Sequence, residues 1–407
     1  MNVIKIKKTD LFFFTALIIF LSYQMLSASL FNGLLDFSIA KYVCFFIVSG
    51  LLLYKFVLDS SYKNILIYVV ILLVFVLVGL HAQNIRDLIL IGLFILEARN
   101  VKFDSILKTY AWVLSIGLSI IILLYFIGFF NSVDYKVLLT GLRIGTKKIR
   151  HSLGFGWVTY APNFFMTVAI CCIYLTRSQR KVAKTYIILT IVNILLYYFT
   201  DTNVVFFELL LLLVLAVVAR SLRIDLTKKT MIKVILSLTF IICAAFSLWI
   251  SFNYSSSNPW MRKIDVATNY RLTLTKRALD LYSIKLFGNP IKWITVSTTD
   301  KQINYVDSSY VQLLVQYGVF VFGIVLILST TDMIYTIKKG DTVGILCLII
   351  IAIHSITDPQ LFNLAYNPFL LEIGYILLSE SSGYGGNRKK GSVPNEYKYI
   401  YEKKSCN

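Results

Sequence analysis

Residues 203–219 read NVVFFELLLLLVLAVVA, a run in which Glu208 is the only charged side chain. A helix needs roughly 20 mostly apolar residues to cross a bilayer. Similar runs recur along the 407-residue chain, which is 57% hydrophobic and has a mean hydropathy of +0.74. This composition excludes a soluble globular protein, and continuously apolar runs lack the alternation of barrel strands. The sequence therefore predicts an all-α, polytopic membrane protein.

Twelve apolar runs are candidate transmembrane helices. They cover residues 11–31, 37–57, 64–80, 83–98, 106–130, 157–176, 185–200, 203–219, 231–250, 310–330, 342–356 and 361–379. Basic residues before the first run favour a cytoplasmic N-terminus, and twelve crossings then place the C-terminus in the cytoplasm too. We expect four regions: spans 1–9 in residues 1–250, a large extracytoplasmic loop at 251–309, spans 10–12 in 310–379, and a flexible cytoplasmic tail at 380–407.

The charges of the loops agree with this orientation, with one exception. The inner loops hold thirteen Lys and Arg residues, whereas the short outer loops hold five. All five lie in the single loop 131–156, namely Lys136, Arg143, Lys147, Lys148 and Arg150. The large loop 251–309 carries eight more basic residues. A protein with two cationic outer segments is expected to bind an anionic ligand on that face.

The large loop contains a helical pattern over roughly 261–287, with apolar residues at spacings of three and four. On such a helix Arg271 and Arg277 lie about 120° apart, so one can face a binding site while the other faces solvent. Arginine is the side chain best suited to bidentate binding of phosphate. The alternative is a solvated amphipathic helix lying on the membrane surface.

The basic loop 131–156 ends in Ser152-Leu153-Gly154-Phe155-Gly156, directly after Arg150. Small residues let the backbone approach a ligand closely, and the preceding basic run supplies partners for phosphate. The alternative is a turn that leads into a helix, with lysines reaching toward lipid head groups.

Acidic and histidine side chains near the predicted spans are further candidates. Asp307 precedes Ser308 at the start of span ten, where it caps the helix, binds sugar hydroxyls or acts as a base. His354 and Asp358 are spaced i and i+4 near the outer end of span eleven, although Pro359 follows at once. Glu208 and Glu372 lie within spans, so both should face the bundle interior and pair with another side chain.

Several kinds of chemistry are not predicted. The chain has no P-loop, no Gly-x-Gly-x-x-Gly, no HExxH and no Ser-His-Asp pattern. Its six cysteines and three histidines show no metal-ligand spacing. We expect no metal site, no cofactor and no nucleic-acid partner.

The architecture and motifs together resemble bacterial polysaccharide polymerases of the Wzy type, in the O-antigen polymerase and ligase superfamily. Residues 150–156 resemble a family motif that in relatives continues with His-Pro-Asn, whereas here five residues precede Pro162 and Asn163. The motifs at 269–271, 286–288 and 307–310 read Asn-Tyr-Arg, Leu-Phe-Gly and Asp-Ser-Ser-Tyr, and are similar to short motifs of the family. His354 matches by position a histidine of the ligase relatives.

The resemblance implies an enzyme of the bacterial plasma membrane that acts on oligosaccharide repeat units linked through diphosphate to a polyprenol. Arg143, Arg150, Arg271 and Arg277 would bind the diphosphate, with Arg150 and Arg271 acting in catalysis and His354 or Asp307 as the base. A flippase and a chain-length regulator would be partner proteins. Two alternatives remain open: a ligase that transfers finished glycan to another acceptor, and a flippase or exporter of the same lipid. The sugars, their linkage, the control of chain length and the oligomeric state do not follow from the sequence.

Overall fold

The computed structural model describes residues 8–34, 37–59, 62–130, 150–177, 179, 182–268, 270–294 and 304–378. These residues form helices and connecting loops with no strand, which confirms the all-α prediction for the described part. The helices of the first half are α1 (Lys8–Ala28), α2 (Phe31–Leu34), α3 (Phe37–Asp59), α4 (Tyr62–His81), α5 (Ile85–Glu97), η1 (Ala98–Asn100), α6 (Phe103–Phe126), α8 (Tyr160–Leu175) and α9 (Ala183–Thr200). Those of the second half are α10 (Asn203–Ser221), α11 (Thr230–Ser237), α12 (Thr239–Asn253), α13 (Pro259–Ala267), α14 (Arg271–Leu281), α15 (Ser309–Gln316), α16 (Gly318–Lys338), α17 (Thr342–Thr357) and α18 (Leu370–Leu378).

Within the described residues, six helices are long and apolar enough to cross a membrane: α1, α3, α6, α9, α10 and α16. The pair α11 and α12 is bent by 48° and would add a seventh if it forms one broken span. Large apolar side chains on these helices face outward, such as Phe46 and Trp112, which are 68% and 69% exposed. Exposure on this scale belongs in lipid, so the chain is a membrane-embedded protein.

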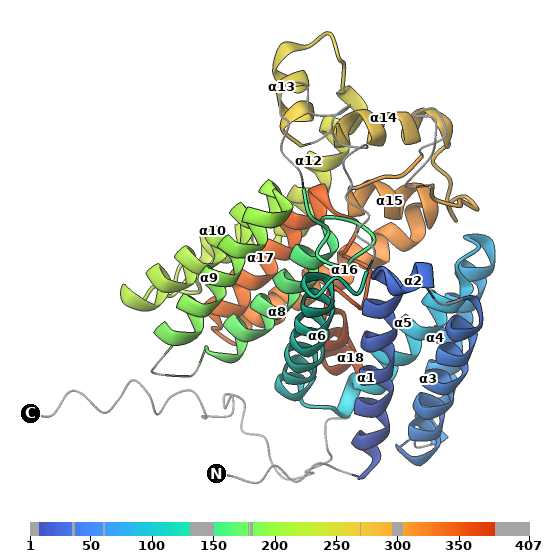
Figure 1. Cartoon of the computed structure of the whole chain (residues 1–407). Helices are drawn as coiled ribbons and strands as arrows, with labels where there is room; N and C mark the ends of the chain where they lie inside the picture. Colours follow the sequence, from blue (N-terminus) through green and yellow to red (C-terminus); the bar gives the residue numbers. More distant parts are fainter. Residues whose placement is uncertain are drawn as a thin grey trace, which may run out of the picture.

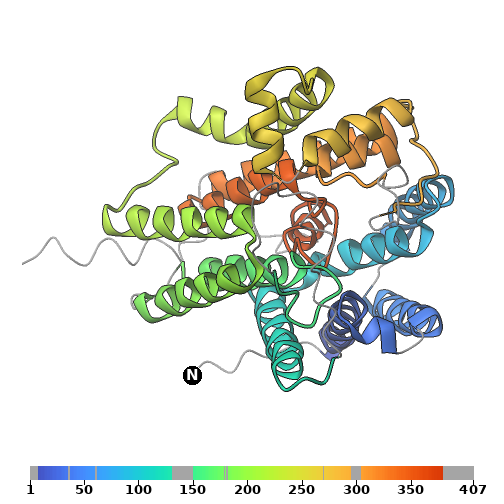
Figure 2. The same ribbon diagram turned by 45° about the horizontal axis from the view of Figure 1, so that its top comes forward.

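The helices form one bundle. α1 packs on α3 and α6, α8 packs on α6, α9 and α10, and α17 packs on α10 and α12. Figure 2 shows the last helices, in orange and red, in the middle of the view, between the green helices α8–α10 and the blue helices α1–α5. Residues from both halves of the sequence therefore line the interior, where buried polar groups can meet.

The predicted span 310–330 is broken between α15 and α16. Gly318 has φ +85°, a conformation that L side chains rarely adopt, and Gly288 of the preceding loop has φ +79°. The two glycines lie against each other's backbone. Val319 N and Phe320 N donate to Lys285 O and Leu286 O, both at 3.1 Å. The loop motif Leu286-Phe287-Gly288 thus docks into the helix break and satisfies its backbone groups.

The predicted span 361–379 is helical only from Leu370 within the described residues, because Pro359 and Pro368 interrupt any helix before that point. Residues 358–369 run irregularly through the bundle interior. Protein groups satisfy their backbone: Tyr110 Oη donates to Leu364 O at 2.7 Å, and Thr167 Oγ1 donates to Tyr366 O at 2.9 Å. Irregular backbone at membrane depth needs such partners.

The segment that follows α12 contains two short helices where the sequence predicted one. α13 begins after Asn258, whose side chain accepts a hydrogen bond from Trp260 N, with Pro259 in the first turn. α13 and α14 are separated at Tyr270, which has φ +60°. Both helices lie at one end of the bundle, beyond α12 and α15 (Figure 1). The break matters for the site, because it makes Arg271 the first residue of α14.

The other end of the bundle carries buried ion pairs. Lys55 Nζ lies 3.2 Å from Glu97 Oε2, and Arg99 Nη1 lies 3.4 Å from Glu97 Oε1, with all three side chains at most 2% exposed. Arg177 pairs with Asp104, which follows Arg99 by five residues, at 2.7 Å, and with Asp341 at 3.3 Å. Because Asp341 and Asp358 flank the two ends of α17, the pair of Arg177 with Asp341 and the contacts of Asp358 lie at opposite ends of that helix.

Candidate functional site

Arg271, the first residue of α14, meets two carboxylates that come from different parts of the chain. Its Nη1 lies 2.8 Å from Asp358 Oδ2, and its Nε lies 4.0 Å from Asp307 Oδ2. Nη1 also donates to Thr357 O at the end of α17. The Arg271 side chain is 14% exposed. One guanidinium therefore joins α14, the segment before α15, and the end of α17.

The local sequence explains why Asp307 is available for this contact. Ser308, not Asp307, is the N-cap of α15, because its hydroxyl accepts a hydrogen bond from Val311 N at 3.4 Å. The capping role considered for Asp307 is therefore wrong. The carboxylate of Asp307 turns instead to Arg271 and is 20% exposed.

His354 joins the cluster from the last turn of α17. Its Nδ1 lies 2.6 Å from Glu208 Oε2, and its Nε2 lies 3.1 Å from Gln360 Oε1 and 3.9 Å from Asp358 Oδ2. The predicted pairing of Glu208 is thus confirmed, with histidine as the partner. Glu372, the other carboxylate within a predicted span, pairs with Lys339 at 3.1 Å, as expected.

Asp358 is the centre of the cluster. It contacts Arg271 and lies near His354, and its Oδ1 accepts a hydrogen bond from Asn163 Nδ2 at 3.3 Å. Its backbone oxygen accepts one from Ser309 Oγ at 2.5 Å. Pro359 ends α17 just after Asp358, so the i and i+4 pair forms at a separation of 3.9 Å and not at hydrogen-bond distance.

Burial and neighbouring charges shift the pKa values of the loop residues. Burial raises the pKa of Asp307 to about 6, opposed by the positive charge of Arg271 and assisted by Asp358. Burial alone would lower the pKa of Arg271, but Asp358 and Asp307 outweigh it and raise the pKa. Burial, with Asp307 next in importance, raises the pKa of Tyr305 well above its usual range. Near neutral pH the arginine is charged and Asp307 is mostly ionised.

Arg150 occupies a different position, at the turn between α9 and α10. Its Nε donates to Thr200 O at 2.6 Å and its Nη2 donates to Thr202 Oγ1 at 3.4 Å. The side chain is buried, and no described contact joins it to Arg271. Thr202 precedes Glu208 by six residues, about 9 Å along a helix. Arg150 thus closes the turn at the same end of the bundle as the cluster.

The glycine motif that follows Arg150 binds backbone of the same chain. Gly156 N donates to Ala28 O at 2.8 Å, and Leu30 N donates to Gly154 O at 2.9 Å. Gly154 has φ +86°. The close backbone approach predicted from the small residues is present, but its partner in the described structure is the end of α1 and not a ligand site.

The remaining predicted arginines do not join the cluster in the described part of the chain. Arg143 lies outside the described residues. Arg277 is half-buried on α14 and takes no part in the contacts between Arg271 and its carboxylates. Among the described residues no group of three or more His, Cys, Asp and Glu side chains is arranged to hold a metal ion.

The structure adds residues that the sequence did not single out in these roles. No sequence motif marks Gln360 or Tyr305. The sequence spacing pairs Asp358 only with His354, whereas in the structure it holds Arg271. Glu208 is the only charge in an apolar run, so it needs a partner in the bundle interior. This requirement is the sequence signal that points toward His354. In comparisons with known proteins, no family model, no curated protein and no solved structure matches this chain.

Proposed function

We propose that the protein is a glycosyltransferase that polymerises oligosaccharide repeat units carried on a polyprenyl diphosphate, at the outer face of the bacterial plasma membrane. The twelve crossings predicted from the sequence would leave both termini in the cytoplasm and the cluster around Arg271 outside. The observation that carries the proposal is the contact of Arg271 with Asp307 and Asp358, which in turn lies beside His354, at one end of the bundle.

The proposed reaction is a displacement at the anomeric carbon of the growing chain. A hydroxyl oxygen of the incoming repeat unit forms a bond to that carbon, and the bond from the carbon to the diphosphate oxygen breaks. The electron pair leaves with the polyprenyl diphosphate, and the proton of the hydroxyl passes to a base. The leaving group is already activated, so the reaction needs no nucleotide.

Arg271 is suited to stabilise the departing diphosphate. Nη1 is held by Asp358 and Thr357, which fixes the plane of the guanidinium, whereas Nε and Nη2 donate no hydrogen bond to any described residue. Preorganised donors aimed at developing negative charge are worth about 10²–10³ in rate when one is removed. The ion pair with Asp358 thus orients Arg271, and Nη2, which donates no hydrogen bond to a described residue, is left for a phosphate oxygen.

Asp307 is the better of the two predicted bases. A pKa of about 6 lets it be ionised at neutral pH while remaining basic enough to accept a proton in the transition state. His354 is held on both ring nitrogens, by Glu208 and by Gln360, and so has no nitrogen left for a substrate in this arrangement. We assign His354 to positioning Asp358 and, through it, Arg271.

The direct test is an assay of the purified protein in detergent with lipid-linked repeat unit and no nucleotide. We expect a ladder of products that differ by one repeat unit, together with released polyprenyl diphosphate. A deletion strain should carry single repeat units on its surface. Unattached long chains in that strain would favour a ligase instead. Lipid-linked units retained on the cytoplasmic face would favour a flippase, and either result would overturn the polymerase proposal.

A further inference from the structure

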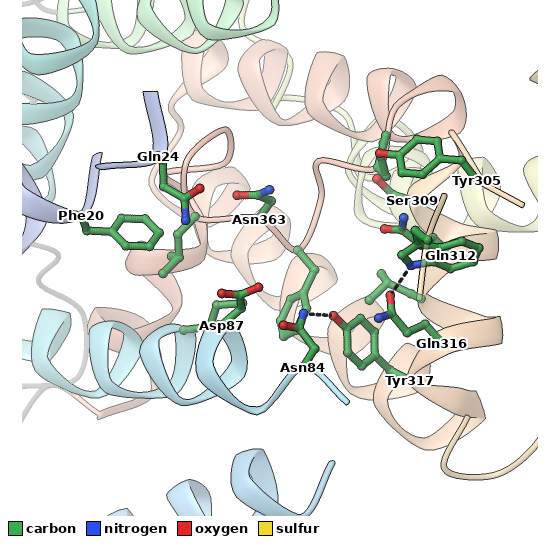
Figure 3. Close-up of a pocket in the computed structure, with 16 residues that line it drawn as sticks. Phe20, Gln24, Asn84, Asp87, Tyr305, Ser309, Gln312, Gln316, Tyr317 and Asn363 are labelled. Carbon is green, nitrogen blue, oxygen red and sulfur yellow. Dashed lines mark hydrogen bonds between the residues drawn. The ribbon is translucent and has the colours of Figure 1, made fainter. Parts of the chain in front are cut away.

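A cavity of about 270 Å³ lies beside the arginine cluster (Figure 3). Its walls come from α1, α5, α15 and the irregular segment after α17, with Trp293 and Tyr305 contributed by the outer loop. The volume is near the lower limit of the range of about 300–1000 Å³ for small-molecule sites, which suits one sugar ring rather than an oligosaccharide.

The polar side chains of this cavity are amides and one carboxylate. Gln24, Asp87 and Gln312 line it, and none of the three side chains has a hydrogen-bond partner among the described residues. Figure 3 shows Gln24 and Asp87 on one side of the cavity and Gln312 on the other. An amide offers two donors and one acceptor oxygen, and a carboxylate only accepts. Together they match the mixed donor and acceptor character of sugar hydroxyls.

Two other polar side chains are already fixed and hold the aromatic walls in place. Trp293 Nε1 donates to Gln316 Oε1 at 2.9 Å, and Asn84 Nδ2 donates to Tyr317 Oη at 3.0 Å, both drawn as dashed lines in Figure 3. Aromatic rings offer apolar faces against which the C–H face of a sugar can pack. These side chains are therefore oriented before a ligand binds.

Among the described residues that line the cavity there is no lysine or arginine. Asp87 would repel a phosphate or a uronic acid, and the amides carry no charge to neutralise one. The cavity and the arginine cluster thus differ in charge, although they share a wall. Ser309 lines the cavity and donates to Asp358 O, and the ring of Tyr305 lines the cavity and interacts electrostatically with Asp307.

We propose that this cavity binds an uncharged sugar ring of the incoming repeat unit, and so presents its hydroxyl to the cluster around Arg271. The assignment to the incoming unit rests on the proposed function. In this arrangement the two sites differ in charge. Arg271 binds the diphosphate, and the cavity binds the neutral sugar between Asp87 and Gln312.

The test separates binding from turnover. The probe is a phosphate-free, fluorescently labelled oligosaccharide, obtained by partial hydrolysis of the surface polysaccharide of the organism, and binding to the purified full-length protein is followed by fluorescence anisotropy. We expect saturable binding that Asp87→Asn and Gln312→Leu each weaken at least tenfold, because the first replaces an acceptor oxygen with a donor group and the second removes the hydrogen-bonding amide. Arg271→Ala should bind the probe as the wild type does, and inorganic diphosphate should not compete.

Asp280→Asn is the matched control, because it removes the same charge from an exposed outer-loop position away from the cavity. Equal loss of probe binding in this control, absence of saturable binding to the wild type, or competition by inorganic diphosphate would overturn the proposal. Correct folding of each variant is checked by its elution as a single species in detergent.

A kinetic measurement distinguishes failure of this inference from failure of the proposed function. If the cavity binds the incoming unit, Asp87→Asn and Gln312→Leu raise the KM for lipid-linked repeat unit at least tenfold with less change in kcat. A product ladder with unchanged KM in both variants would refute the cavity assignment and leave the polymerase intact. Cavity-dependent probe binding without any ladder would refute the polymerase and leave a glycan-binding cavity.

Discussion

Arg271 and Asp358 are 87 residues apart in the sequence, yet Nη1 of the arginine lies 2.8 Å from Oδ2 of the aspartate. The contact joins α14 to the end of α17. Both side chains are largely withdrawn from solvent, at 14% and 6% exposure, so neither can lose its partner without leaving a poorly solvated charge. The ion pair therefore stabilises the packing of α14 on α17, and Arg271 is also proposed to stabilise the leaving group. Replacement of Arg271 can separate these two roles.

Replacement of Arg271 tests the diphosphate assignment. Arg271→Ala should lower the rate of polymer formation by about 10²–10³, because it removes a preorganised donor to the leaving group. Arg271→Lys keeps the charge and the pairing with Asp358 but not the planar fork, so we expect a folded protein with an intermediate loss of rate. The measurement is product-ladder formation by purified variants.

Asp358→Asn serves as the control for that experiment. It also removes the ion pair, but the protein still contains the guanidinium group of Arg271. A full-length polymer from correctly inserted Arg271→Ala protein at the wild-type rate would show that the arginine does not serve the leaving group.

The pKa of Asp307 predicts an acid limb in the activity profile. Its folded pKa, about 6, lies above the ordinary value of 3.8, so the carboxylate is protonated and unable to act as a base below pH 6. Transfer should fall about tenfold per pH unit below that point. Asp307→Asn should have low activity and no limb near pH 6. A wild-type profile that is flat between pH 5 and 7.5 would exclude Asp307 as the base.

The ionisation of Asp307 is expected to affect stability and activity in opposite directions as the pH changes. Because the pKa is raised on folding, the contribution of Asp307 to stability is complete below its ordinary pKa of 3.8 and is lost as the pH rises through about 6. Activity and stability should therefore move in opposite directions over this window.

The contact between Gly288 and Gly318 predicts a steric requirement at the helix break. Gly318→Ala places a Cβ against the backbone of Leu286 and Gly288 in a residue with φ +85°, so we expect a loss of at least about 2 kcal/mol of stability. Gly323→Ala, on the same helix with nothing within 4 Å of the new atom, should be neutral or slightly stabilising. Thermal unfolding in detergent compares them, and equal midpoints would contradict the docking of the 286–288 motif.

The buried pair of Lys55 and Glu97 predicts strong coupling between two replacements. Lys55→Met leaves Glu97 buried with fewer partners and should cost about 3–5 kcal/mol, whereas adding Glu97→Gln should recover most of that loss. Lys276→Met breaks the exposed pair with Asp280 and should change stability by less than about 1 kcal/mol. Additive losses in the double variant would mean that the two buried charges act independently.

The proposed orientation predicts which loops a membrane-impermeant maleimide reaches. In a cysteine-free background, Asp280→Cys on α14 should be labelled in intact cells, because its side chain is 61% exposed and is proposed to lie outside. Lys228→Cys, in the exposed connection between α10 and α11, should be labelled only after permeabilisation. The reverse pattern would place Arg271 in the cytosol and end the diphosphate assignment.

The sequence determined the class of fold and identified the charged residues that need a partner inside the bundle. Apolar runs fix helices in a bilayer because every backbone polar group must be satisfied within the segment, so the all-α membrane protein followed from composition alone. The same reasoning required a partner for Glu208 and Glu372, and both have one. Span number and orientation, by contrast, rest on counting runs and charges and stay predictions.

Only the tertiary structure decided which of these charges meet. Arg150 and Arg271 are alike in sequence, as cationic residues in predicted outer loops, but one closes a turn on Thr200 and the other reaches Asp307 and Asp358. The two breaks that bring this about, at Tyr270 and at Gly318, are set by how the loop packs on the bundle and not by local periodicity. Contacts between residues far apart in the chain depend on that packing, which no local pattern encodes.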